Sequence, residues 1–247
     1  MYKFDSRIRY SECDSEGKLA VTSLLNYFQD CSTLQSEDLG IGVKALHKRG
    51  TMWVVNSWQI DIIRLPELSE RVETGTLPYE VRGFFGKRNF YMKDARGEYL
   101  AKADSLWTYI SMKTASPERI PQDIIDGYGE DQRLDMDYQG RKISYPKDEN
   151  AGVVSRDIQV TEYLLDANHH VNNGKYVELA AGLVPEASEA KRIRVEYRKQ
   201  AFLGEIIRPV IYRSDEKTVV NLTDTEGSPY SVVEFKTASQ IAEGAGK

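Results

Sequence analysis

Several features that define common protein classes are scarce in this 247-residue chain. Its two cysteines, Cys13 and Cys31, can form neither a disulfide framework nor a CxxC metal site, so a cytoplasmic location is expected. No stretch approaches the roughly 18 consecutive apolar residues of a membrane span, and the N-terminus lacks a basic-then-apolar export signal. The net charge of -5 argues against a nucleic-acid binder.

The first half of the chain has the pattern of one strand, one long helix and a series of strands. Residues 2–10 alternate as a strand does. The next apolar residues recur on one helix face, at Leu24, Leu25, Phe28 and Cys31. Thr22 or Ser23 can cap this helix and Gly40 can end it. Four β-rich runs separated by turn residues follow between residues 51 and 113.

The second half repeats this order after a segment rich in proline, glycine and acids. That segment predicts a linker with a short helix after Pro121. A strand, a helix from about residue 172 to Pro185 and several strands come next. We therefore predict an N-terminal domain over residues 1–116, a linker over 117–153 and a C-terminal domain over 154–247.

The two halves also align residue by residue. Setting "WQIDIIRLPELSERV" (58–72) over "IRVEYRKQAFLGEII" (193–207) pairs Asp61 with Glu196, Leu68 with Leu203 and Glu70 with Glu205. Together with the matching element order, this favours a tandem duplication of an α+β unit, each copy a curved antiparallel sheet wrapped around one long helix. Two unrelated α+β domains are the alternative.

Polar residues that can carry chemistry gather in "LLDANHHVNNGKY", residues 164–176. In the N-terminal copy, "CDSEGKLAVT" (13–22) places Asp14 where Asp166 stands, but Lys18 where His170 stands. Because the N-terminal copy lacks the imidazole, a chemical site is expected in the C-terminal half.

Only one of the two adjacent histidines is expected to face a given pocket, because neighbours on an extended segment point in opposite directions. His170, four residues after Asp166, is the candidate, and His169 is expected in solvent. A metal site needs further ligands, and the remaining histidine, His47, lies in the other half, so neither a metal nor a cofactor is expected.

Turn formation and helix capping are the simpler explanation for acids and amides in this stretch. They account for Asn172 or Asn173 but leave Asn168 and His170 without a reason. A turn before a helix N-terminus can instead hold an anion or a developing oxyanion. An acid, an amide and an imidazole at such a place suit hydrolysis of an activated acyl group.

The "LDANHHVNN" stretch resembles the "LDxNxHVNN" turn of the acyl-acyl carrier protein (acyl-ACP) thioesterases. "WQIDIIRLPELSERVETGT", "ADSLWTYISMKTASPERIP" and "VEYRKQA" are similar to strands of the same family. The resemblance implies a double hotdog fold whose C-terminal half supplies Asp166, Asn168 and His170 as the catalytic group. The family often has a glutamate and a cysteine where this chain has Gln200 and Ala201, so a cysteine nucleophile is impossible there.

This resemblance implies attack by water on a thioester, with His170 or Asp166 taking the proton and Gln200 supporting. A covalent route through Asp166 stays open. The N-terminal half would supply most of the acyl-chain pocket, with Phe28 and Trp53 as candidates, although both residues are also ordinary core residues.

The partner implied by the resemblance is acyl carrier protein, whose acidic surface requires a local positive face. The densest basic stretches contain Lys87, Arg88, Lys191 and Arg192, which can equally be solvated strand residues. Acyl-coenzyme A hydrolysis and acyl binding without turnover are the alternatives, while no HFPG-like segment supports a dehydratase. Either a monomer or a homodimer is compatible with the fold.

Overall fold

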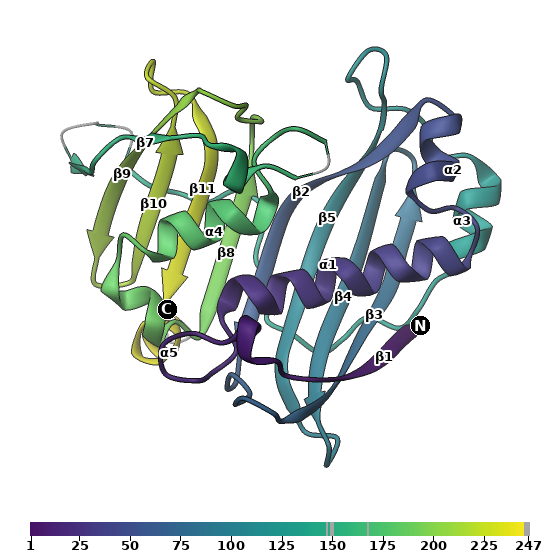
Figure 1. The fold of residues 1–247 in the computed structure, drawn as a ribbon, viewed down its shortest axis with the longest axis horizontal. Coiled ribbons are helices and arrows are strands. Elements are labelled where there is room, and N and C mark those ends of the chain that lie inside the picture. Colours follow the sequence, from purple (N-terminus) through teal and green to yellow (C-terminus); the bar gives the residue numbers. More distant parts are fainter. Residues whose placement is uncertain (147, 149–150, 167, 245–247) are drawn as a thin grey trace. The chain divides into compact units, whose positions relative to one another are not determined.

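The computed structural model describes residues 1–146, 148, 151–166 and 168–244. They form two compact units, one of Met1–Trp58 with Ile62–Gln139 and one of Gln59–Asp61 with Gly140–Lys247. Each unit is an antiparallel sheet with one main helix lying along a face of it (Figure 1). The predicted tandem hotdog, an α+β fold, is therefore confirmed. One boundary, between Gln139 and Gly140, lies within residues 117–153, whereas Gln59–Asp61 also belong to the second unit; the predicted domain bounds stay a prediction.

The first unit begins with β1 (Tyr2–Arg7), a 3-10 turn (Tyr10–Glu12), α1 (Val21–Asp38) and α2 (Val43–Lys48). The long strands are β2 (Thr51–Ile62), β3 (Arg71–Arg82), β4 (Phe85–Asp94) and β5 (Tyr99–Ser111), and α3 (Gln122–Tyr128) follows them. Their order in the sheet is β1-β3-β4-β5-β2. The short helix predicted after Pro121 is α3.

The predicted apolar face of α1 packs against the sheet of the first unit. Its Phe28 is fully buried, with its ring 5.5 Å from that of Phe90 on β4. The predicted stop at Gly40 is confirmed, because Gly40 follows the C-cap Leu39 with a left-handed φ of 71°. The predicted N-terminal cap is wrong: α1 begins at Val21, so Thr22 and Ser23 lie inside its first turn. Instead, the Ala20 N–H group donates to the Glu12 carbonyl at 2.9 Å, which fixes the entry of the chain without a side-chain cap.

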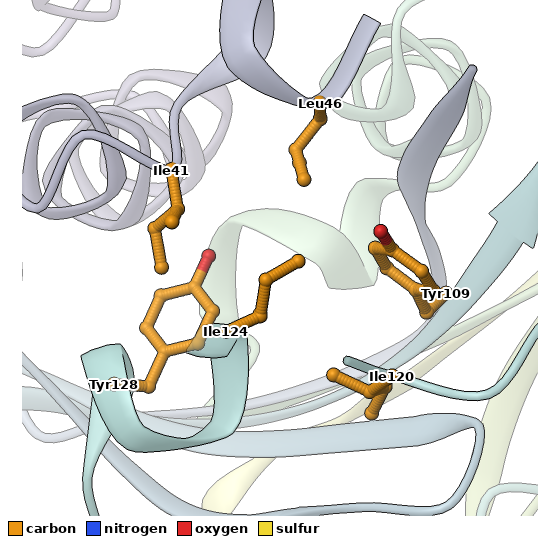
Figure 2. Packing of buried hydrophobic residues seen from close by; sticks show 6 residues of the cluster. All are labelled: Ile41, Leu46, Tyr109, Ile120, Ile124 and Tyr128. Atoms are coloured by element: carbon orange, nitrogen blue, oxygen red, sulfur yellow. The ribbon is translucent and has the colours of Figure 1, made fainter. Parts of the chain in front are cut away.

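A second apolar cluster lies where α2 and α3 meet the end of β5. Figure 2 shows its six side chains converging, namely Ile41, Leu46, Tyr109, Ile120, Ile124 and Tyr128. Trp53 of β2 packs against this cluster, 5.2 Å from the ring of Tyr109. These contacts explain why the chain after β5 returns to the first unit as α3.

The second unit repeats the architecture in shorter form. It contains β6 (Val153–Val154), β7 (Ile158–Gln159), a 3-10 turn (Glu162–Leu164), α4 (Asn173–Ala181) and a 3-10 segment (Pro185–Glu189). Four strands and a last helix follow as β8 (Arg192–Tyr197), β9 (Ile206–Ser214), β10 (Lys217–Thr223), β11 (Pro229–Lys236) and α5 (Ala238–Gly244). The sheet order is β8-β11-β10-β9-β6, with β7 also on β9.

The duplication extends to individual hydrogen bonds. The Glu67 N–H group donates to Oε2 of Glu70 at 3.0 Å, and the Phe202 N–H group donates to Oε2 of Glu205 at 2.9 Å. Ser69 and Gly204, which the alignment pairs, both have a left-handed φ, of 74° and 84°. The two turns were therefore matched correctly from the sequence.

The segment after α3, residues 129–138, packs on the face of the first sheet opposite α1. It is held there by Asn89, which is fully buried. Because Asn89 and Phe90 are adjacent on β4, their side chains point to opposite faces of the sheet, and Phe90 faces α1. The Asn89 Oδ1 atom accepts bonds from the Leu134 N–H group at 3.0 Å and from the Tyr138 hydroxyl at 2.9 Å. This polar site fixes the chain that leads to the second unit.

Candidate active site

The polar stretch of the second unit folds into a tight turn between a 3-10 turn and α4. The Asp166 N–H group donates to the His170 carbonyl at 2.9 Å, and the His169 N–H group donates to the Asp166 carbonyl at 3.0 Å. His169 has a φ of 63°, a left-handed value that most side chains disfavour. Gly17 has a φ of 76° at the matching position of the N-terminal turn. His169 therefore serves the backbone of the turn, and it is exposed, as predicted.

His170 and Asp166 face each other across this turn. The Nδ1 atom of His170 lies 3.6 Å from Oδ2 of Asp166, and the two side chains are only 14% and 19% exposed. This distance suits an ion pair and is longer than a hydrogen bond. The other carboxylate oxygen, Oδ1, accepts the Asn168 N–H group at 2.7 Å, which fixes the orientation of the carboxylate.

Neighbouring segments hold the turn from two sides. The Val171 N–H group donates to the Ala201 carbonyl at 2.9 Å, and His170 forms an isolated β-bridge with Phe202. On the other side, Asn172 caps α4 by accepting the Gly174 N–H group on its side-chain oxygen at 2.8 Å. The turn is thus locked between the start of α4 and the chain after β8.

Tyr176 on α4 ties the same two elements together from below. Its hydroxyl accepts the Ala201 N–H group at 3.0 Å, and the residue is 2% exposed. Burial raises the pKa of Tyr176, and the nearby Glu205 and Asp166 carboxylates add to this effect. The phenol therefore stays neutral and serves as a fixed hydrogen-bonding group beside the turn.

The structure brings the predicted catalytic residues together to different degrees. Asp166 and His170 are in contact, and the backbone of Asn168 touches Asp166, while the Asn168 residue itself is exposed. Gln200 is exposed and lies next to Ala201, whose backbone anchors the turn. Two of the first N–H groups of α4, those of Gly174 and Lys175, are already bonded to Asn172.

The two predicted pocket residues lie in the interior of the first unit. Phe28 is fully buried between Trp58 and Phe90. Trp53 is partly buried, and its Nε1 atom is buried without a hydrogen-bond partner among the described residues. Both residues belong to the packed interior of the hotdog; the predicted acyl pocket stays a prediction.

Burial changes the set of residues available for docking a carrier. Arg88 is 8% exposed, donates to Gln35 Oε1 at 3.1 Å and lies over the ring of Tyr128. Arg192 is 7% exposed. Neither arginine can offer its charge to a partner at the surface, which leaves Lys87 and Lys191. Lys87 pairs with Glu80 at 2.8 Å.

Sequence reasoning missed Phe202 and Glu205 as neighbours of the site. Each alignment paired one side of the site with its N-terminal counterpart, but the two were not combined. Once the structure shows that Glu67 meets Lys18, the two alignments place Phe202 opposite His170, and both β-bridges are present.

Two kinds of site are absent from the part of the chain that the structure describes. No group of three or more histidine, cysteine, aspartate or glutamate side chains there is arranged to hold a metal ion. Among the same residues, no helix combines the length and apolar character required to cross a membrane.

Two hotdog units, one of which carries an acid–imidazole turn ahead of its helix, define a double hotdog of the thioesterase type. The model of the acyl-ACP thioesterase N-terminal domain matches residues 1–128, and that of the C-terminal domain matches residues 147–238. The chain belongs to the acyl-ACP thioesterase family.

Named relatives are similar at low identity. An acyl-[acyl-carrier-protein] hydrolase of Cuphea viscosissima is 23% identical over 214 residues, covering 81% of this chain and 52% of the relative. A palmitoyl-acyl carrier protein thioesterase of Arabidopsis thaliana is 23% identical over 222 residues, covering 84% of this chain and 54% of the relative. The chain thus spans about half the length of the curated relatives it matches.

Solved structures match over nearly the whole chain. An acyl-ACP thioesterase from Bacteroides thetaiotaomicron is 21% identical, covers 95% of this chain and 96% of its own, and has a TM-score of 0.85. The 12:0-ACP thioesterase from Umbellularia californica is 22% identical, with the same coverage and a TM-score of 0.83. These likenesses establish the fold.

Proposed function

We propose that this protein hydrolyses the thioester of a fatty acyl-acyl carrier protein and releases the free fatty acid. The observation that carries the proposal is the contact between His170 and Asp166, 3.6 Å apart and mostly buried at the turn before α4. Membership of the acyl-ACP thioesterase family supports the substrate class. A buried acid–imidazole pair is a suitable general base for water.

Water attacks the thioester carbonyl carbon while the imidazole of His170 takes a proton from it. Asp166 orients the ring through Nδ1 and stabilises the imidazolium that forms. When the C–S bond breaks, the imidazolium returns the proton to the leaving thiolate. The products are the fatty acid and the free thiol of the carrier, and His170 is neutral again. A general base of this kind contributes about 10²- to 10⁴-fold to the rate.

Two other routes give Asp166 a more direct part in the reaction. It can take the proton of water while His170 polarises the substrate, or its carboxylate can attack the carbonyl carbon and form a mixed anhydride that water then opens. Mass spectrometry of enzyme quenched in acid during turnover distinguishes the covalent route from the others, because an acyl group on Asp166 adds its mass to the chain.

Asn168 is the proposed donor to the thioester oxygen as it becomes an oxyanion. Its exposure leaves the side-chain amide accessible to substrate, and one well-placed donor is typically worth about 3 kcal/mol. Gln200, exposed beside the anchoring Ala201, is a supporting residue that orients water or substrate and cannot act as a base.

The acyl chain is proposed to enter the first unit, near Phe28 and Trp53. Trp53 is the more informative of the two, because it is only partly buried and carries an unpaired indole nitrogen among the described residues. Replacing it with alanine should change the preferred chain length, whereas a core role alone predicts lower stability with an unchanged preference.

Carrier docking is proposed to use Lys87 and Lys191, the two members of the predicted basic set that remain outside the core. Charge reversal at either position should raise KM for an acyl-ACP and leave KM for a small acyl thioester unchanged. Equal effects on both substrates would argue against docking there. Lys113, which is exposed and lies outside both basic stretches, is the control.

The deciding experiment uses the purified chain with a panel of acyl-ACP thioesters, and free fatty acid is measured against chain length. The same chains on coenzyme A test the second carrier. Release of fatty acid mainly from acyl-ACP supports the proposal. Faster release from acyl-coenzyme A would mean that the protein is an acyl-coenzyme A thioesterase. Tight binding of acyl chains without any release would mean an acyl-binding protein and refute the hydrolase.

A further inference from the structure

We propose that Phe202 is a positioning residue for His170, because its apolar ring holds the imidazole beside Asp166. At the matching position the N-terminal copy has a charged residue, Glu67. The inference rests on the proposed hydrolysis and concerns how its base is kept ready. It adds to the site a residue outside the acid–amide–imidazole stretch.

Backbone and side chain of Phe202 both contact His170. The two residues form an isolated antiparallel β-bridge, and the neighbouring Val171 N–H group donates to the Ala201 carbonyl at 2.9 Å. Their rings are 6.4 Å apart at an interplanar angle of 84°, an edge-to-face arrangement. The phenyl ring thereby restricts the orientations open to the imidazole without taking either of its nitrogens.

Phe202 is itself held by the sheet of the second unit. Its N–H group donates to Glu205 Oε2 at 2.9 Å, and the same oxygen accepts the Tyr230 hydroxyl at 3.1 Å. Tyr230 lies on β11 and is 2% exposed. A continuous chain of contacts therefore runs from the sheet core through Glu205 and Phe202 to His170. Phe202 remains 48% exposed, so core packing does not explain a phenylalanine there.

The N-terminal copy provides an internal comparison. There Lys18 forms the β-bridge with Glu67, in the place of His170 with Phe202. The turns are otherwise alike, since the Asp14 N–H group donates to the Lys18 carbonyl at 2.8 Å as Asp166 does to His170 at 2.9 Å. One copy thus places a lysine and a glutamate at the bridge, where the Lys18 ammonium binds Glu16 at 2.9 Å, and the other copy places two rings there.

The difference between the copies matters for a base. A carboxylate in the place of Phe202 would favour the protonated imidazolium, which cannot take a proton from water. A phenyl ring adds no charge and leaves Asp166 as the imidazole's acidic partner. The two sequence positions therefore suit a base only in the combination found in the C-terminal half.

The elements next to His170 carry other charged groups, which are the same in all the variants below. The turn carries Asp166 and His169, the segment after β8 carries Arg198, Lys199 and Glu205, and α4 carries Lys175 and Glu178. Lys199 pairs with Asp224 at 2.7 Å and Lys175 with Glu178 at 3.0 Å. Only the substitution itself changes the charge facing the imidazole.

The test follows the imidazole directly by NMR titration, which is practical because the chain has only three histidines. Phe202→Glu should move the titration midpoint of His170 upward by about one pH unit or more, and the acidic limb of kcat should move with it. Leu203→Glu places the same charge one residue further along the same turn. It should move the titration midpoint of His170 and the acidic limb of kcat much less. Phe202→Gln isolates the loss of the ring from the charge.

For Phe202→Gln we expect the midpoint to stay close to that of the native protein, kcat to fall about tenfold and KM to change little, with Phe202→Tyr restoring the rate. Equal midpoint shifts for Phe202→Glu and Leu203→Glu, or a native rate in Phe202→Gln, would overturn the proposal. If the native protein hydrolyses no thioester, the proposed function fails, yet the titrations still decide whether Phe202 controls His170.

Discussion

Asp104 offers a quantitative test of the polar site that holds residues 129–138, because burial raises the pKa of Asp104 from 3.8 to about 6. Its Oδ1 atom accepts the Tyr79 hydroxyl at 2.8 Å and the Asn89 amide at 3.2 Å. Asparagine at this position keeps the oxygen that accepts both bonds and removes only the charge. Asp104→Asn should therefore stabilise the protein at neutral pH.

The sign follows from proton linkage. Below about pH 3 the carboxyl is protonated in both the folded and the unfolded chain, so its ionisation does not affect stability. As the pH rises from about 3 to above 6, the unfolded chain loses the proton first, so stability falls. A difference of about two pKa units corresponds to about 3 kcal/mol, which partial exposure of Asp104 reduces to about 1 to 2 kcal/mol.

The assay is thermal or urea unfolding of the native protein and of Asp104→Asn between pH 4 and 7.5. At about 2 to 4 °C per kcal/mol for a chain of this size, the variant should melt about 2 to 8 °C higher at pH 7.5 and within about 1 °C of the native protein at pH 4. Asp135→Asn, an exposed aspartate of the same segment, is the control and should change nothing. A variant less stable than the native protein at pH 7.5 would refute the reasoning.

Three further predictions concern single residues. His169→Gly should keep kcat within about twofold, because Gly17 adopts the same left-handed φ in the other copy, while His169→Val should lower the free energy of unfolding by about 1 to 2 kcal/mol. Tyr176→Phe leaves the buried Ala201 N–H group without its acceptor and should cost about 1 to 3 kcal/mol in urea unfolding. Asn89→Ala should lower Tm by about 8 to 16 °C through four lost hydrogen bonds, and a drop of under 3 °C would mean that the segment is held elsewhere.

The duplicated architecture was readable from the sequence because local pattern fixes it. The apolar face of α1 follows from the spacing of its apolar residues, and the helix after Pro121 follows from the proline at its start. Matched turns fall at aligned positions because the same backbone geometry requires a left-handed residue, as at Ser69 and Gly204. The cap of α1 was missed because a backbone bond from Ala20 to Glu12 replaces a side-chain cap.

The direction of each side chain decides which of the predicted carrier-docking residues is exposed, and the sequence alone did not show it. Lys87 and Arg88 are adjacent on a strand, so they must face opposite sides of the sheet. Arg88 turns inward to Gln35 and Lys87 turns outward to Glu80. A run of basic letters on a strand therefore overstates the positive surface, and only the register of the strand reveals which residue is buried.

Part of the candidate site could also be predicted from the sequence. Asp166 and His170 lie on one short turn, where local sequence fixes their proximity. Phe202 and Glu205 reach the site only through tertiary pairing of distant segments, so no local pattern could place them.

Turnover of acyl-ACP by Asp166→Asn and His170→Ala, with folding checked by circular dichroism and thermal unfolding, tests the central claim most directly. The account predicts that each variant stays folded and loses at least about 10²-fold in kcat/KM, because each removes one member of the pair that activates water. Rates within a few-fold of the native protein in both variants would contradict it.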